Sequence, residues 1–243
     1  MRVVVSGGEG DAKFAKATMA ETTDADDREL YRLGGLSAIV LGVAYLVIFP
    51  LYAQVGAPPV GGQAWLDHLA GKTTIWWAIL ALSVLTDVLF LPFGFALYAM
   101  LKAVHRNAML LALALVGLFV VVDLAVTWTN IGALLTLSAD HAAATTDAQR
   151  AAYVAAADFA SAVIASPLER VYAILFLSIG ILIIGLVMLR GAFGRIPAYL
   201  GVVTGLLGIV AQTGWGASII LNAVLATIWI LVSGFRLQRL ARQ

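Results

Sequence analysis

Cysteine is absent from this chain, and charged residues are scarce. Without cysteine there is no disulfide, no thiolate-bound metal and no catalytic thiol. Aspartate, glutamate, lysine and arginine make up 12% of the residues, about half the share found in an ordinary soluble domain, while 62% are hydrophobic. Because the apolar residues form long runs, the composition predicts a protein that lies in a lipid bilayer.

The chain also lacks a strong net charge and is poor in histidine. The net charge is +1, and no run of lysine and arginine with interleaved aromatic residues occurs, so nucleic acid is excluded as a partner. None of the three histidines falls within an apolar run, which argues against haem held between helices. The Asp-His pairs at His68 and His141 match no recognised zinc spacing. We expect neither a metal site nor a cofactor.

Six apolar runs approach the roughly 20 residues that a helix needs to cross the hydrocarbon layer. The sequence therefore predicts an all-α, polytopic transmembrane helical bundle with six spans. A cytoplasmic, polar and flexible N-terminal tail (1–32) would precede a transmembrane domain (33–243). We place the spans at Leu33–Tyr52, Thr74–Leu101, Ala108–Leu137, Leu168–Leu189, Pro197–Ala211 and Ser218–Phe235.

The distribution of lysine and arginine predicts the orientation of these spans. Twelve of the fifteen basic residues lie in the N-terminal tail, in the second and fourth connections and at the C-terminus; three lie in the other connections. The positive-inside rule then makes both termini cytoplasmic. In this orientation Trp76, Trp77 and Trp215 fall near the outer interface, where tryptophans commonly form a belt.

The connection between the third and fourth spans, residues 138–167, is long and rich in alanine. Thr146 and Gln149 have the spacing of a capping box, which indicates the start of a helix. The stretch that follows contains Arg150 and Asp158 and few bulky apolar residues. We therefore expect a helical segment on the outer face and not a seventh span.

The fourth span begins with a second helix-start signal. Ser166 is suited to the N-cap position, Pro167 to the first helical position and Glu169 to the third. This pattern interprets Glu169 as a capping residue.

Two aspartates interrupt the apolar runs. Asp87 lies within ALSVLTDVLFLPFGFALYAM and Asp123 within LFVVVDLAVTWTN. Asp87 is fifteen residues before Lys102, and Asp123 is sixteen after Asn107. At 1.5 Å per residue, both acids lie about 23 Å from the turn that joins their spans, and so at one depth. An ionised aspartate at the centre of a membrane costs about 2.5 to 3.5 kcal/mol, so we expect both to face the bundle interior.

Helical spacing adds other polar side chains at this level. Thr127 and Asn130 follow Asp123 at i+4 and i+7, and Asn222 on the last span could complete the cluster from the opposite side. If the carboxyls of Asp87 and Asp123 meet without a cation, they cannot comfortably both ionise, and a proton is shared or retained. These five residues form the predicted intramembrane polar cluster, a candidate proton or ion site.

Two classes of function remain. The first is a structural or regulatory membrane subunit that binds lipid, another membrane protein or a second copy of itself, with the acids acting as hydrogen-bonding groups between helices. The alternative is a small proton- or cation-linked transporter or permeation protein that uses Asp87 and Asp123. An enzyme ranks third, because no nucleophile, base and orienting group can be assembled from three interfacial histidines.

Two stretches, LYAMLKAVHRNAMLLALALVG and FGRIPAYLGVVTGLLGIV, resemble the corresponding hairpins of a bacterial family of six-helix integral membrane proteins. That family is catalogued only as a domain of unknown function. The resemblance covers roughly residues 30–240 in layout. It implies six spans and a multi-pass location in the bacterial inner (plasma) membrane, and it brings no catalytic residues.

Overall fold

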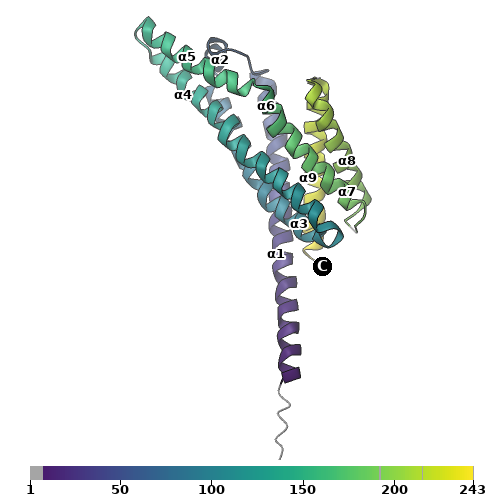
Figure 1. The fold of residues 1–243 in the computed structure, drawn as a ribbon. Coiled ribbons are helices and arrows are strands. Elements are labelled where there is room, and N and C mark those ends of the chain that lie inside the picture. Colours follow the sequence, from purple (N-terminus) through teal and green to yellow (C-terminus); the bar gives the residue numbers. More distant parts are fainter. Residues whose placement is uncertain (1–7, 192, 215, 243) are drawn as a thin grey trace, which may run out of the picture.

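The computed structural model describes residues 8–191, 193–214 and 216–242, and this part of the chain is almost entirely helical, with no strand (Figure 1). The prediction of an all-α chain is confirmed. Two π-helical segments and one 3-10 turn interrupt or join the α-helices. The elements in chain order are α1 (Gly8–Val55), α2 (Gly62–Leu69), α3 (Thr73–Asp123), η1 (Leu124–Trp128), α4 (Thr129–Ala143), α5 (Asp147–Ile164), α6 (Pro167–Glu169), η2 (Arg170–Phe176), α7 (Leu177–Met188), α8 (Arg195–Val210), η3 (Ala211–Thr213) and α9 (Gly216–Leu240).

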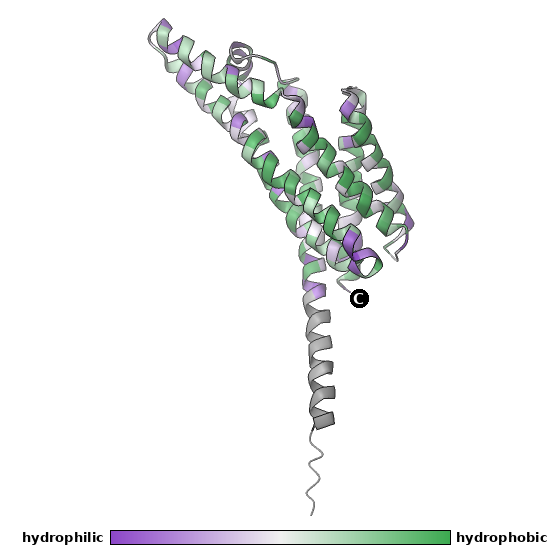
Figure 2. Cartoon of the chain, in the orientation of Figure 1, coloured by the Kyte–Doolittle hydropathy of each residue, from purple (hydrophilic) through white to green (hydrophobic). Residues whose placement is uncertain are grey.

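Five helices in the described part of the chain are long and apolar enough to cross a membrane. Hydrophobic residues cover the sides of the bundle over most of its length, as Figure 2 shows. Many of these side chains are exposed, including Leu36, Val121 and Ile220. Apolar surface on the outside of a helical bundle is typical of helices that face lipid. The five stretches are Asp27–Val55, Thr73–Ala143, Pro167–Met188, Arg195–Thr213 and Gly216–Leu240.

The second of these stretches is 71 residues long and contains a break at His105. The backbone of His105 is extended, with φ −158° and ψ 84°, and its Nδ1 accepts a hydrogen bond from the amide of Ala108 at 3.2 Å, in the manner of an N-cap. Residues 73–104 and 106–143 fold back on each other. The contact between Phe90 and Phe119 shows this: their rings pack edge to face with centroids 5.5 Å apart. The break falls between the predicted second and third spans.

α1 starts well before the first predicted span. It runs from Gly8 to Val55 without interruption, so it continues through residue 32, where we placed the end of a polar tail. Its N-terminal part extends beyond the other helices in Figure 1. Residues 1–7 of the predicted tail lie outside the described residues, and the flexibility of the tail stays a prediction.

A large hydrophobic core lies among α1, α3, α7, α8 and α9. Phe93 of α3 and Trp229 of α9 pack with ring centroids 5.6 Å apart and are both nearly inaccessible. Close approach of α7 and α8 depends on glycine: a β-carbon added at Gly205 would lie 2.5 Å from Cβ of Leu182 and 2.7 Å from the carbonyl oxygen of Ser178. These glycines serve packing inside the bundle.

A second core forms at the end of the bundle opposite the His105 break, beneath α2 and α5. Trp65 and Trp76 pack with ring centroids 5.3 Å apart, and Tyr52 meets the edge of Trp76 at 5.7 Å. Trp76 is fully buried, so our prediction that it belongs to an interfacial belt was wrong: aromatic packing in the fold takes it out of contact with lipid. Trp77, by contrast, is 48% exposed, and Trp215 lies outside the described residues.

The predicted helix in the connection between residues 138 and 167 is present as α5. The capping box is confirmed, because Thr146 accepts from the amide of Gln149 while the Gln149 side chain accepts from the amide of Thr146. α5 lies against α2: Asp158 accepts from the amide of Gly62, and Ser161 accepts from that of Gly61 at 2.8 Å. Asp158 thus holds the first turn of α2. Ser166 also caps as expected, with Leu168 as donor.

We expect Gly205→Ala to lower the free energy of unfolding by about 1–3 kcal/mol, because the added methyl group forces α7 and α8 apart. Gly117→Ala is the matched control, since a β-carbon there meets nothing within 4 Å. Its stability should be unchanged or slightly higher. Thermal unfolding of the two purified variants in detergent checks this, and equal midpoints would contradict the packing argument.

Candidate functional site

Asp87 and Asp123 face each other inside the bundle. Both are buried, with 2% and 5% of their surface exposed. The indole Nε1 of Trp128 donates to Oδ2 of Asp87 at 2.9 Å and to Oδ2 of Asp123 at 3.1 Å. Since one N–H group reaches both carboxyls, the two side chains are immediate neighbours. Asp87 comes from 73–104 and Asp123 from 106–143, so the fold-back at His105 creates the site.

Trp128 is the residue of this site that the sequence analysis missed. It is five residues after Asp123, whereas neighbours on an α-helix are three or four residues apart. The segment Leu124–Trp128 is π-helical, with one residue more per turn, and this places Trp128 over Asp123. π-Helical turns are frequent at functional sites. The one sequence signal was an indole N–H close to a buried acid.

The predicted polar stripe along this helix divides at the π segment. The hydroxyl of Thr127 is buried and lies 3.2 Å from the phenol oxygen of Tyr172, which belongs to the second π segment, η2. The Asn130 side chain instead donates to the carbonyl of Val126 in its own helix, at 2.7 Å. Thr127 therefore connects the carboxyl region to a neighbouring helix, and Asn130 does not.

Asn222 lies at a different interface. Its side-chain amide donates to the carbonyl of Thr204 at 2.7 Å and so joins α9 to α8. Among the described residues, no hydrogen bond links Asn222 to Asp87 or Asp123. Asn222 does line a cavity of about 160 Å³ together with Ser178 and Tyr45. Tyr45 also interacts electrostatically with Asp87, so it belongs both to this cavity and to the surroundings of the carboxyl pair.

The carboxyl pair has few partners. Within the described part of the chain, no lysine or arginine forms an ion pair with Asp87 or Asp123. Oδ1 of Asp123 is buried and has no hydrogen-bond partner. A third acid, Glu169, lies near enough to interact electrostatically with Asp123 and with Tyr172. The sequence indicates only a capping role for Glu169. Its approach to Asp123 depends on how two distant segments pack, and a local sequence pattern does not show this.

The histidines do not gather with acids. The ring of His68 packs against Trp65 and Trp76, with centroids 5.9 Å from each. Burial, and secondarily the charge of Lys72, lower the pKa of His68. Among the residues that the structure describes, no three histidines, aspartates or glutamates lie close enough together to hold a metal ion.

Comparison with protein-family models, with curated proteins and with solved structures found no match. The resemblance to a bacterial six-helix family therefore stays a prediction.

We expect Trp128→Phe to lower the free energy of unfolding by about 1–3 kcal/mol, because it removes a donor shared by two buried acceptors. Trp77→Phe is the control, since Trp77 is half exposed. Thermal unfolding in detergent measures both variants. If Trp128→Phe melted with the parent chain, the shared hydrogen bond would contribute nothing to stability.

Proposed function

We propose that the chain crosses the bacterial inner membrane six times, with both termini in the cytoplasm. The break at His105 supports this, because a continuous 71-residue helix would extend over about 107 Å, far beyond a hydrocarbon layer of about 30 Å. The excess of lysine and arginine at the end of the bundle that holds the His105 break supports the orientation. α5 then lies on the outer face.

Single cysteines introduced into this cysteine-free chain test the topology directly. We expect Arg106→Cys and Arg190→Cys to react with an impermeant maleimide from the cytoplasmic side only. Gln63→Cys and Ala143→Cys should react from the outer side only. Labelling of inverted and right-side-out membrane vesicles measures this, and the parent chain gives the background. Labelling of Arg106→Cys and Ala143→Cys from one side would contradict six crossings.

We propose that the protein is a proton-linked transporter or permeation protein in which Asp87 and Asp123 exchange the proton. The observation that carries this proposal is the convergence of two buried carboxyls on one N–H donor, with no cation paired to them among the described residues. Two negative charges 4 Å apart repel by roughly 4 kcal/mol at an effective dielectric constant of 20. A pair in such surroundings is most stable with one proton between the two carboxyls, and it can release and rebind that proton when water or another base reaches it.

A route toward the outer face supports proton exchange. The contact between Thr127 and Tyr172 joins the helix that bears Asp123 to η2, and Glu169 lies one turn before Tyr172, at the end of its membrane-length helix. Hydroxyl and carboxyl groups at such intervals can pass a proton, especially with intervening water. Close to Asp87, Tyr45 lines the 160 Å³ cavity together with Ser178 and Asn222, and this cavity is large enough for water.

Reconstituted vesicles test the proposal. We expect the purified protein to dissipate an imposed pH gradient, measured with an internal pH-sensitive dye, and Asp87→Asn to reduce this flux to that of protein-free vesicles. Tyr172→Phe should slow the flux, because it removes the hydroxyl of the outer route. Asp140→Asn, at an exposed position, is the matched control and should behave as the parent chain. A flux that survives both Asp87→Asn and Asp123→Asn would contradict the proposal.

The second candidate is a structural or regulatory subunit that binds lipid, another membrane protein or a second copy of itself. One observation favours it: the hydrogen bonds from Trp128 join the halves of the 73–143 segment, so neutral carboxyls would already serve to hold two helices together. In that case the vesicles carry no flux, and the infrared band of protonated carboxyls does not change across the neutral pH range.

A further inference from the structure

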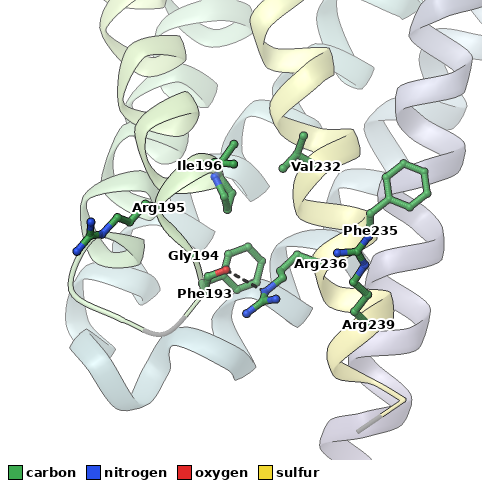
Figure 3. A pocket seen from close by; sticks show the side chains of 9 residues that line it. Phe193, Gly194, Arg195, Ile196, Val232, Phe235, Arg236 and Arg239 are labelled. Atoms are coloured by element: carbon green, nitrogen blue, oxygen red, sulfur yellow. Dashed lines mark hydrogen bonds between the residues drawn. The ribbon is translucent and has the colours of Figure 1, made fainter.

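A cationic pocket lies at the end of the bundle that holds the C-terminus, remote in sequence from the carboxyl pair. It is formed by the α7–α8 connection, the first turn of α8 and the last turns of α9, and it has a volume of about 410 Å³ (Figure 3). Its lining contains three arginines and no acidic residue. The lining residues are Phe193, Gly194, Arg195, Ile196, Pro197, Val232, Phe235, Arg236 and Arg239.

A hydrogen bond holds one of the arginines that line the pocket. Nε of Arg236 donates to the carbonyl oxygen of Phe193 at 3.1 Å, which holds this side chain across the gap between α9 and the connection. The Phe193 ring itself is fully buried. α8 begins at Arg195, and its N-cap, Gly194, has a φ of 119° and no side chain that could accept from the first turn. The amides of that turn add to the positive potential of the arginines.

The C-terminal part of the sequence carries charged side chains of one sign. From Arg170 to the C-terminus the sequence contains six arginines and no aspartate or glutamate. Arg195 on α8 and Arg239 on α9 both line the pocket and are exposed; the Arg195 side chain extends from the first turn of α8 away from Arg236, as Figure 3 shows. The arrangement therefore favours an anion, and guanidinium groups bind phosphate through charge-assisted hydrogen bonds.

A second, apolar groove continues from the pocket along the outside of α8. It has a volume of about 350 Å³, shares Arg195 and Ile196 with the pocket, and is otherwise lined by Tyr199, Leu200, Val203 and Leu225. Several of these side chains are strongly exposed: Ile196 by 70%, Tyr199 by 59% and Val203 by 46%. A free phosphate ion has no use for such a groove, whereas the acyl chain of a lipid fits it.

We propose that the pocket and groove together bind one anionic phospholipid of the adjoining leaflet. Arg236 and Arg239 contact the headgroup phosphate, Arg195 adds positive charge where the pocket joins the groove, and an acyl chain lies in the groove between α8 and α9. Basic pockets between membrane helices bind anionic headgroups in this way. The site is separate from the carboxyl pair and does not depend on the proton-linked function.

Native mass spectrometry of the full chain in detergent tests the proposal, with phosphatidylglycerol titrated against phosphatidylcholine of the same acyl chains. We expect preferential binding of phosphatidylglycerol and a fall in its affinity of about tenfold or more in Arg195→Gln/Arg239→Gln, because one charge-assisted contact and the positive charge at the junction of pocket and groove are lost. Both arginines are exposed, so the lipid-free variant should melt with the parent chain. Arg195→Lys/Arg239→Lys should keep a larger part of the affinity than the glutamine variant.

The matched control removes two positive charges from the neighbouring turn at the same end of the bundle, as Lys102→Gln/Arg106→Gln. This turn lies beside the α7–α8 connection: Gly191 of that connection adjoins Val104 and Leu101. The control should bind phosphatidylglycerol as the parent chain does; an equal loss in both double variants would overturn the proposal and leave only general attraction of anions. Unchanged binding in the glutamine variant would also overturn it.

Two further arms identify the source of the phosphate. Three competitors are compared at equal concentration. Long-chain phosphatidylglycerol should displace the bound lipid strongly, short-chain phosphatidylglycerol weakly, and inorganic phosphate not at all. Displacement by inorganic phosphate as effective as that by the long-chain lipid would overturn the assignment to a lipid. Asp87→Asn should bind the lipid normally, so a failure of proton flux and a failure of lipid binding are distinguishable.

Discussion

A single indole N–H group, shared by two buried carboxyls, is the interaction on which the centre of this molecule depends. A hydrocarbon layer offers no water to a polar group, so each donor and acceptor must find its partner within the protein. Trp128 meets this requirement for one oxygen of Asp87 and one of Asp123, while Oδ1 of Asp123 has no partner. These hydrogen bonds therefore join the two helical arms of the 73–143 hairpin at this level.

Two π-helical segments determine which side chains meet at the site. η1 adds a residue to the turn after Asp123, which brings Trp128 over the carboxyl and leaves Thr127 directed at Tyr172 of η2. Such segments weaken the regular hydrogen bonding of a helix, and the fold offsets this cost with packing from neighbouring helices. The same irregularity turns Asn130 out of the polar stripe. Its side chain instead donates a hydrogen bond to a carbonyl of its own helix.

The two ends of the bundle are built from different chemistry. At the α5 end, aromatic packing of Trp65 and Trp76 and the capping of α2 by Asp158 close the structure, and charged side chains such as Asp147 and Arg150 lie on its surface. At the opposite end, arginines surround a pocket that opens beside apolar helix surface. The two ends therefore differ in their side chains, and the carboxyl pair lies in the helical bundle between them.

The sequence by itself determined the helical class, the limits of most apolar helices, the capping box at Thr146 and the common depth of Asp87 and Asp123. These follow from runs, spacings and rise per residue, all of which are local. Tertiary structure alone decided that Trp128 joins the pair, that Glu169 approaches it, and that Asn222 bonds elsewhere. A π segment shifts every later residue around the helix, and the partner that a side chain meets across a bundle depends on how distant segments pack. An α-helical sequence pattern shows neither the position of a π segment nor the packing of distant segments.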